Sequence, residues 1–349
     1  MTGGDMPELR IDPVRKRAVI IAVERARRPR DYQIPEEERQ LHVCPFCYGN
    51  EDKTPPEVFA IRPPGSAPNT PGWRVRVTPN KFPALRIEGE LQREGVGLFD
   101  KIAGIGAHEV VIENPDHDRS LADLSVEEIR DVLLAYRERI RDLRKDERFR
   151  YILVFKNHRA AAGASISHSH SQIIATPITP SVVVQELKAA QEHYLRKERC
   201  IFCDIIKQEL AIGKRVVKAD DDYMLWTPFA SSFPFETWLF PMKHRHDFAC
   251  LSEDELLILA RAMKDMLLRI KLALNDPPYN FVLHTCPSLT PRPGKPHYWG
   301  TIEYDYHWHL ELVPRLTKIA GFEWGTGFYI NPTPPEVAKE ELSKVNIEL

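Results

Sequence analysis

The sequence predicts an α+β fold of two related halves, in which an antiparallel sheet (a half-barrel) has helices packed on one side. Two observations predict this fold. The order Cys-x-x-Cys, histidine, helix, strand and His-x-His occurs twice along the 349 residues. The strand-like segments also lack the regular spacing of parallel βαβ units. We therefore expect a duplication, with one half over residues 1–180 and the other over residues 181–349.

Strand signals come first along the chain. The segment from Leu9 to Val23 alternates loosely and turns at Asp12-Pro13, which predicts a hairpin. Residues 74–77 and 110–112 are strand-like, and the apolar run 151–155 precedes the first His-x-His. The strands of the sheet therefore come from segments that lie far apart in the sequence.

Helical patterns follow. The segment from Ser125 to Lys145 begins with a serine cap and an acidic first turn, and its apolar residues recur at helical spacing. The segment from Ser252 to Leu274 repeats this pattern. We expect residues 181–199 to form a helix that joins the halves, and residues 335–344 to form a short C-terminal helix.

The composition excludes several classes of partner. Charged residues make up 28 % of the chain, apolar residues 43 %, and the formal net charge is −2. Nothing in this balance indicates a basic stripe for nucleic acid. No apolar run approaches the roughly 20 residues that a membrane-spanning helix needs. The first residues lack a signal-peptide pattern, so we expect a cytoplasmic protein without nucleic-acid or membrane partners.

The paired cysteines favour metal binding over disulfides. Four of the six cysteines form the Cys-x-x-Cys pairs, and matching histidines follow each pair. Structural zinc takes four such ligands in a tetrahedron, which leaves no open position. The expected zinc ligands are Cys44, Cys47, His117 and His168 in the first half, and Cys200, Cys203, His244 and His307 in the second.

The second metal site has an alternative. It consists of nitrogen and oxygen ligands that suit iron or zinc, namely Glu186, His284, His307 and His309. Because His307 belongs to both sets, the sequence leaves open which of them holds the second metal.

The segment Ser167-His168-Ser169-His170-Ser171-Gln172 carries the candidate chemistry. In an extended strand His168, His170 and Gln172 share one face. With His168 on a metal, His170 is free to act as a nucleophile towards phosphorus. Gln172 can then donate to a phosphate oxygen as charge develops in the transition state. The plain alternative is that His170 is only a hydrogen-bonded strand residue.

The second half differs at the corresponding position. It keeps His309 but has Glu311 where the first half has Gln172. A carboxylate repels a phosphate, so we expect only the first half to be chemically active. The second half is then expected to serve as a scaffold and a wall for the substrate.

These motifs resemble the histidine-triad superfamily and, within it, the galactose-1-phosphate uridylyltransferase family. The resemblance covers nearly the whole chain. The segments that are similar to the family's signatures are Arg10-x-Asp12-Pro13, Arg25-x-x-Arg28-Pro29, Cys44-Pro45-Phe46-Cys47 and Pro115-Asp116-His117.

The resemblance implies a ping-pong transfer. UDP-glucose would donate a uridylyl group to His170, and galactose 1-phosphate would accept it, without magnesium chemistry. It also implies a homodimer, in which residues that reach the hexose often come from the partner subunit. The substrate-binding residues that it implies are Arg25, Arg28, Asn80, Asn157, Gly163, Ser165, Lys318 and Glu323.

The sequence also departs from the family. The active segment is His-Ser-His-Ser-Gln in place of the usual His-Pro-His-Gly-Gln, and Lys81 follows Asn80 where an aspartate is typical. The second Cys-x-x-Cys, residues 220–222 and residues 321–327 look more like the ADP-glucose phosphorylase subgroup. Two alternatives therefore stay open: adenylyl transfer from ADP-glucose to phosphate, and a non-catalytic zinc-containing module that binds nucleotides.

Overall fold

We describe residues 7–22, 29, 32, 43–291 and 298–347 of a computed structural model of the chain. Within these residues, the centre of the fold is a ten-stranded sheet in which all neighbouring strands are antiparallel. Its strands, in spatial order, are β10 (Val216–Ala219), β11 (Tyr223–Trp226), β12 (Thr237–Pro241), β14 (His309–Pro314), β13 (Tyr279–His284), β8 (Tyr151–His158), β9 (His170–Thr176), β7 (Ala107–Ile112), β4 (Val75–Pro79) and β3 (Phe59–Ile61).

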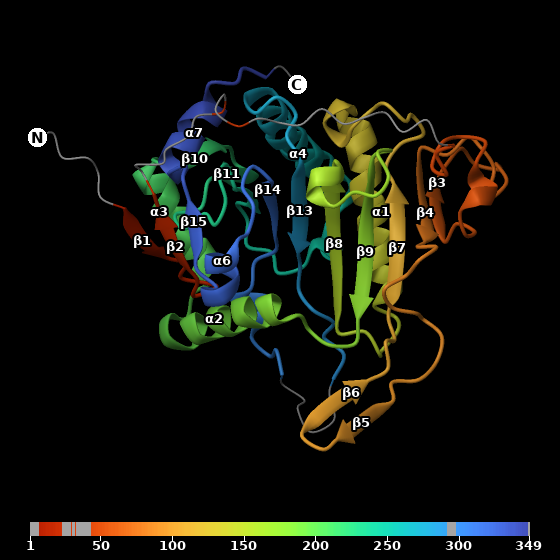
Figure 1. The fold of residues 1–349 in the computed structure, drawn as a ribbon, viewed down its shortest axis with the longest axis horizontal. Coiled ribbons are helices and arrows are strands. Elements are labelled where there is room, and N and C mark those ends of the chain that lie inside the picture. The colour runs from red at the N-terminus through yellow and green to blue at the C-terminus, as the bar shows by residue number, and fades with distance from the viewer. Residues whose placement is uncertain (1–6, 23–28, 30–31, 33–42, 292–297, 348–349) are drawn as a thin grey trace, which may run out of the picture.

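The two halves of the chain meet in the middle of this sheet, where β13 pairs with β8 (Figure 1). Outwards from that seam, each half continues with the strand that carries or follows its His-x-His, β14 or β9, and then with β12 or β7. The order of elements is therefore the same on both sides. This matches the repeat seen in the sequence, while the duplication itself and the division at residue 180 stay predictions.

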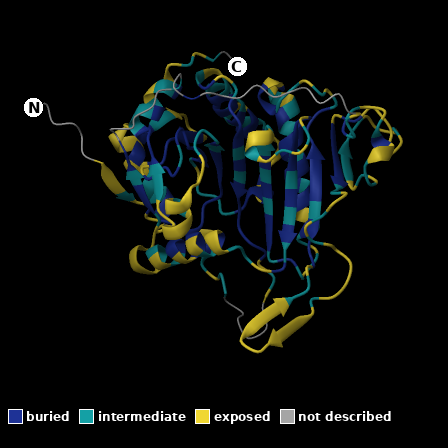
Figure 2. Cartoon of the chain, viewed as in Figure 1, coloured by how far each residue is buried: buried dark blue, intermediate teal, exposed yellow. Residues whose placement is uncertain are grey.

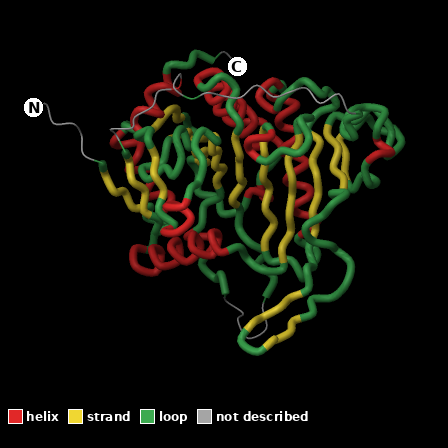
Figure 3. The backbone as a smooth tube through the Cα atoms, viewed as in Figure 1, coloured by secondary structure: helices red, strands yellow, loops and turns green. Residues whose placement is uncertain are grey.

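Two long helices cover one face of the sheet. They are α1 (Val126–Leu143) and α4 (Glu253–Ala273), which pack on each other and lie behind the sheet in Figures 1 and 3. Each begins with a capping box. The side chain of Ser125 or Ser252 accepts from the backbone N–H of the glutamate three residues on, and the carboxylate of that glutamate accepts from the backbone N–H of the serine. Apolar residues of both helices and of the adjoining strand faces form the largest core, which appears as the dark blue centre of Figure 2.

Helices also cover the opposite face, but mainly in the second half. Those are α2 (Ser181–Lys197), α3 (Ile201–Ile212) and the single turn α5 (Ile302–Asp305). Their apolar residues pack with alternate residues of β11 and β12 into a separate core that includes Phe202, Trp238 and Phe240. The expectation that helices pack on one side was therefore too simple, because α3 begins within the second Cys-x-x-Cys, with Cys200 as its N-cap, and its apolar face needs a partner.

Smaller elements complete the fold. The predicted N-terminal hairpin is confirmed as β1 (Glu8–Ile11) and β2 (Ala18–Ile21), and β15 (Tyr329–Asn331) runs parallel to β2. The hairpin of β5 (Arg93–Val96) and β6 (Phe99–Ile102) projects from the body with an exposed surface (Figures 1 and 2). The remaining elements are α6 (Gly321–Thr326), α7 (Pro335–Ser343), and the 3-10 turns η3 (Glu51–Lys53), η4 (Leu121–Asp123), η5 (Ala160–Ala162) and η6 (Phe248–Cys250).

Most local predictions agree with these bounds. The helices expected from residues 125, 181, 252 and 335 are present as α1, α2, α4 and α7. Neither His-x-His lies wholly inside a strand, because β9 begins at His170 and β14 at His309. Among the described helices, none is both long enough and apolar enough to cross a membrane.

Candidate active site and metal-binding groups

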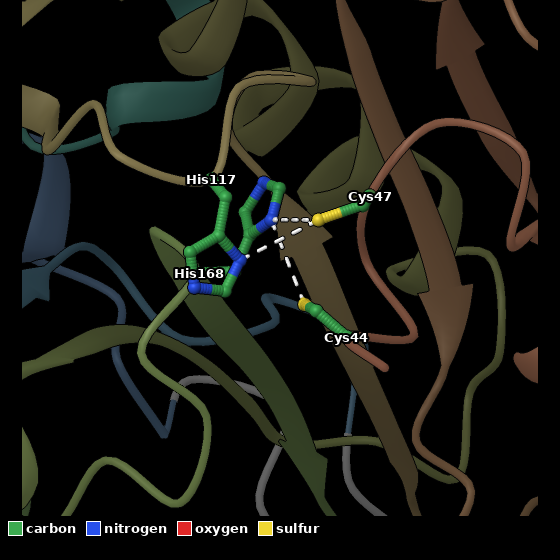
Figure 4. A group of neighbouring side chains, drawn as sticks. All are labelled: Cys44, Cys47, His117 and His168. Atoms are coloured by element: carbon green, nitrogen blue, oxygen red, sulfur yellow. Dashed lines mark hydrogen bonds between the residues drawn. The ribbon is translucent and has the colours of Figure 1, made fainter. Parts of the chain in front are cut away.

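The first predicted zinc set comes together from three separate loops. Cys44 and Cys47 lie in a turn before η3, His117 follows β7, and His168 lies just before β9 (Figure 4). The Sγ atom of Cys47 lies 3.4 Å from Nδ1 of His117 and 3.5 Å from Nδ1 of His168. The Sγ atom of Cys44 lies 3.7 Å from Nδ1 of His168.

These distances fit a tetrahedral metal. Zn–S and Zn–N bonds of ordinary length place a sulfur and a nitrogen about 3.6 Å apart at a tetrahedral angle. The Nε2–H group of His168 donates to the carbonyl oxygen of Asn114 at 2.8 Å, which leaves the lone pair of Nδ1 directed at the cysteines. Burial lowers the pKa of His168 to about 4, so this ring is neutral at physiological pH. The residues present therefore suit zinc, whose binding stays a prediction.

The second predicted zinc set is assembled in a similar way. The Sγ atom of Cys203 lies 3.3 Å from Nδ1 of His244 and 3.6 Å from Nδ1 of His307, and Cys200 belongs to the same group. Nε2–H of His307 donates to the carbonyl oxygen of Pro241 at 2.9 Å. Pro241 precedes His244 by three residues, as Asn114 precedes His117.

The alternative second metal set is not the one that the structure assembles. His307 lies with the cysteines, and the residues that gather beside them are Glu186, His284, His309 and Glu311. The reason is geometric, because residues 307 and 309 direct their rings towards different neighbours. Glu311 therefore belongs to this group where the sequence analysis expected His307.

A guanidinium already binds the two carboxylates of this third group. Nε of Arg15 donates to Glu186 at 2.7 Å, and a terminal nitrogen of Arg15 donates to Glu311. Both carboxylates are thus bound to a fixed cation. Although burial alone would lower it, the charges of Glu186 and Glu311 raise the pKa of His284. The group does not fit iron or zinc while Arg15 is in place.

His170, the candidate nucleophile, is held in one tautomer. Its Nδ1–H group donates to the carbonyl oxygen of His168 at 2.8 Å, so Nε2 carries the lone pair. Among the described residues we find no hydrogen-bond partner for Nε2. Burial and the nearby charge of Lys156 lower the pKa of His170, which keeps the ring neutral. The ring of Phe46, from the first Cys-x-x-Cys, packs against it edge-on at 5.3 Å.

A buried ion pair contacts the backbone of β9, and the sequence analysis did not predict it. On the face that α1 and α4 cover, Nζ of Lys156 contacts Glu113 at 2.6 Å and donates to the backbone carbonyl of His170 at 2.9 Å. Ser169 bonds to both charged groups. Although burial opposes it, Lys156 lowers the pKa of Glu113, so the pair is charged. The feature of the sequence that could have revealed this ion pair is a lysine at a core-facing position of a strand.

Gln172 lies on the same face as His170 and bonds to His108, which the sequence reasoning did not select. Nε2 of His108 lies 2.7 Å from Oε1 of Gln172 and 3.1 Å from Nδ2 of Asn80. A cavity of about 850 Å³ is lined by Asn80 and His108 among others. The structure thereby brings Asn80, a predicted substrate residue, close to Gln172.

Of the predicted phosphate-binding residues, Asn157 lies near the end of β8, and Gly163 and Ser165 lie in the loop between β8 and β9. Oδ1 of Asn157 accepts from Asn280 of the second half at 2.7 Å. Gly163 ends η5 with φ of +97°, a left-handed conformation that glycine adopts without strain. Ser165 is exposed in the same loop, just ahead of His168. These residues therefore surround the end of the strand where His170 begins.

The other predicted substrate residues are not joined to this site. Arg25 and Arg28 lie outside the described residues. Glu323 caps α6 by accepting from the backbone N–H of Ala320 at 3.0 Å, and Lys318 is exposed just ahead of that helix. In the described part of the chain, neither Lys318 nor Glu323 makes a hydrogen bond or ion pair with the residues around His170.

Comparisons with known proteins show the family of the chain. The family model for the galactose-1-phosphate uridyl transferase N-terminal domain matches residues 4–180. ADP-glucose phosphorylase of Arabidopsis thaliana is 37% identical over 98% of this chain and 93% of its own length. Galactose-1-phosphate uridylyltransferase of Thermotoga maritima is 26% identical over 99% of this chain and 100% of its own length.

Solved structures match over a similar extent. The crystal structure of ADP-glucose phosphorylase from Arabidopsis thaliana with bound ADP-glucose has a TM-score of 0.79 and 35% identity, covering 98% of this chain and 100% of that chain. A uridylyltransferase structure has a TM-score of 0.72 and 28% identity, covering 96% and 97%.

The fold and the site thus define a nucleotidyltransferase with a histidine as its candidate nucleophile. The chain belongs to the galactose-1-phosphate uridyl transferase family. Its relatives include both uridylyltransferases and an ADP-glucose phosphorylase, and each kind matches along nearly the whole chain.

Proposed function

We propose that the protein transfers a nucleotidyl group from a nucleoside diphosphate hexose through a covalent intermediate on His170. The observation that carries this proposal is the tautomer of His170, whose bonded Nδ1 leaves the lone pair on Nε2. A neutral imidazole with a fixed orientation is a competent nucleophile towards phosphorus.

The reaction takes two displacements. In the first, Nε2 attacks the α-phosphorus, an N–P bond forms, and the P–O bond to the hexose 1-phosphate breaks. The hexose 1-phosphate leaves with the electron pair. In the second, a phosphate oxygen of the acceptor attacks the same phosphorus, and the N–P bond breaks to restore the lone pair of Nε2. Gln172 stabilises the charge that develops on the non-bridging oxygens.

When bound, the metals would stabilise the structure and take no part in the reaction. Each cysteine and histidine group supplies four protein ligands and so leaves no open coordination position. In the first half, the group ties the Cys-x-x-Cys turn to the residues ahead of β9. That tie sets Phe46 against the ring of His170.

We infer that ADP-glucose is the donor and inorganic phosphate the acceptor. The higher identity to ADP-glucose phosphorylase supports this choice. The second candidate is transfer of UMP from UDP-glucose to galactose 1-phosphate, which the match of the uridyl transferase family model supports. In both cases Asn157, Gly163 and Ser165 are proposed to bind the phosphates.

The remaining substrate contacts are proposals that follow from the family. Arg25 and Arg28 are proposed to contact the nucleotide. Lys318 and Glu323 are proposed to reach the hexose in the other subunit of a homodimer, since they lie apart from His170 in the single chain.

Intact-mass measurement after mixing with each nucleotide sugar tests the function. We expect an adenylyl adduct with ADP-glucose that is absent in His170→Ala. A uridylyl adduct with UDP-glucose alone would select the second candidate instead. His309→Ala, at the corresponding position of the second half, is the matched control and should keep the adduct. No adduct on the metal-loaded wild-type protein with either sugar would contradict both candidates.

A further inference from the structure

His108 is held in one tautomer by the backbone. The N–H group of Ala84 donates to Nδ1 of His108 at 3.1 Å, so Nδ1 must present its lone pair. A neutral imidazole carries its single hydrogen on the other nitrogen. Nε2 of His108 is therefore an N–H donor.

This donor determines which way the amide of Gln172 points. Nε2 of His108 lies 2.7 Å from Oε1 of Gln172, so the carbonyl oxygen of the amide is the bound end. The amide nitrogen of Gln172 then keeps both hydrogens, and among the described residues it has no hydrogen-bond partner. Cross-strand pairing brings this about, because Gln172 of β9 lies opposite Val110, two residues from His108 on β7.

The same ring orders a second amide. Oδ1 of Asn80 accepts from the backbone N–H of Phe82 at 2.9 Å, so Nδ2 is the end that faces His108. It lies 3.1 Å from Nε2 of His108, which already carries a hydrogen and cannot accept from it. Asn80 therefore also keeps its amide hydrogens. Asn80 and His108 line the cavity of about 850 Å³, so a ligand there can reach the amide of Asn80 and the ring that binds Gln172.

We propose that His108 is a positioning residue for nucleotidyl transfer, and this rests on the proposed function. By holding the oxygen of Gln172, it turns the amide nitrogen towards the phosphoryl group that is transferred. Without His108 the amide can rotate and present its oxygen, which repels the phosphate as negative charge develops. Donors that are oriented in advance stabilise a transition state more than donors that must reorient.

The test is a double-mutant cycle of His108→Phe and Gln172→Ala on the metal-loaded protein. His108→Phe keeps the ring shape but removes the N–H group. We expect it to slow formation of the nucleotidyl adduct about tenfold to a hundredfold, with KM for the nucleotide sugar changed less than about threefold. In the Gln172→Ala background the same change should cost less than about threefold, because the group that His108 positions is gone.

A second pair of variants separates positioning from folding. His108→Ala should be slowed similarly, and added imidazole should restore part of its rate by entering the cavity. His193→Phe, a histidine on α2 outside the site, is the matched control and should leave the rate unchanged. Equal losses from His108→Phe with and without Gln172, or no response of His108→Ala to imidazole, would overturn the proposal. A wild-type protein that forms no adduct would instead refute the proposed function.

Discussion

The two His-x-His segments share a backbone contact and an aromatic contact, but differ in the side chain two residues after the second histidine. In each, the second histidine donates through Nδ1 to the carbonyl of the first, at 2.8 Å for His170 and 3.1 Å for His309. In each, the phenylalanine of the Cys-x-x-Cys packs against the second ring, at 5.3 Å and 5.4 Å. The third position is then Gln172 in one half and Glu311 in the other.

Glu311 belongs to a buried ion-pair cluster in the second segment. The guanidinium of Arg15 binds Glu311 and also lies over the ring of Trp238 at 5.0 Å. The ring of His309 is fully buried between neighbours that include Trp238 and Phe240. The carboxylate was expected to repel a phosphate, but in the structure it is paired with the guanidinium of Arg15. A shared scaffold can therefore hold the candidate nucleophile His170 in one half and an internal ion-pair cluster in the other.

The largest expected effect comes from replacing the second histidine of each segment. His170→Ala should lower the rate of adduct formation by about 10⁴-fold or more, because it removes the nucleophile. His309→Ala should stay within about threefold of wild type. Single-turnover kinetics with the preferred nucleotide sugar measure both. Comparable losses in the two variants would show that the halves are not divided in function as described.

The next effect concerns stability. Arg15→Met should lower the free energy of unfolding by about 3–5 kcal/mol, because it leaves buried carboxylates without their cation. The rate of adduct formation per folded molecule should change little. Urea unfolding at pH 7 measures the loss, and metal analysis of the same variant shows whether the vacated group takes up a metal. A variant as stable as wild type would contradict the role given to Arg15.

The pH dependence of stability follows from the same group. Although burial opposes it, the charges of His284 and Arg15 lower the pKa of Glu186 to about 2, against about 4.3 in an unfolded chain. The stabilisation is therefore complete above about pH 4.3 and is lost as the pH falls towards 2. In Arg15→Met the pKa of Glu186 should rise. The loss of stability on acidification should therefore begin at a higher pH, which acid titrations of unfolding measure.

A smaller effect compares the metal groups. Cys44→Ser and Cys203→Ser should each remove one metal ion per chain, as measured by elemental analysis. Cys44→Ser should also slow adduct formation about tenfold to a hundredfold, because the turn that places Phe46 on His170 is released. Cys203→Ser should slow it less, since Cys203 lies in α3 of the second half. Equal slowing would argue against the asymmetry.

The smallest effect should be the same in both halves. Ser125→Ala and Ser252→Ala each remove the capping serine of a long helix and should each lower the free energy of unfolding by about 1 kcal/mol. Matched denaturant titrations measure the pair. A large difference between the two variants would show that α1 and α4 are not equivalent supports of the sheet.

Local elements and the zinc sets could be predicted from the sequence. The caps and apolar spacing of α1 and α4 are local features, because helix contacts join residues three or four apart. The two cysteine and histidine sets followed from spacing that recurs in both halves, and the structure gathers each of them. The free His170 followed from the order of residues within one short segment.

The tertiary structure decided the contacts that join distant strands. Whether His307 belongs to the cysteines or to His309 depended on where each ring points, which alternation along a strand does not specify. The bond from His108 to Gln172 spans 64 residues, and the bond from Arg15 to Glu311 spans 296. Such pairs depend on strand register and on how the N-terminal hairpin packs on the second half, and these arise only when the whole core forms. The candidate ligands and the candidate nucleophile could thus be predicted from short segments of sequence, whereas the ion pairs of Arg15 in the second half depend on contacts between distant parts of the chain.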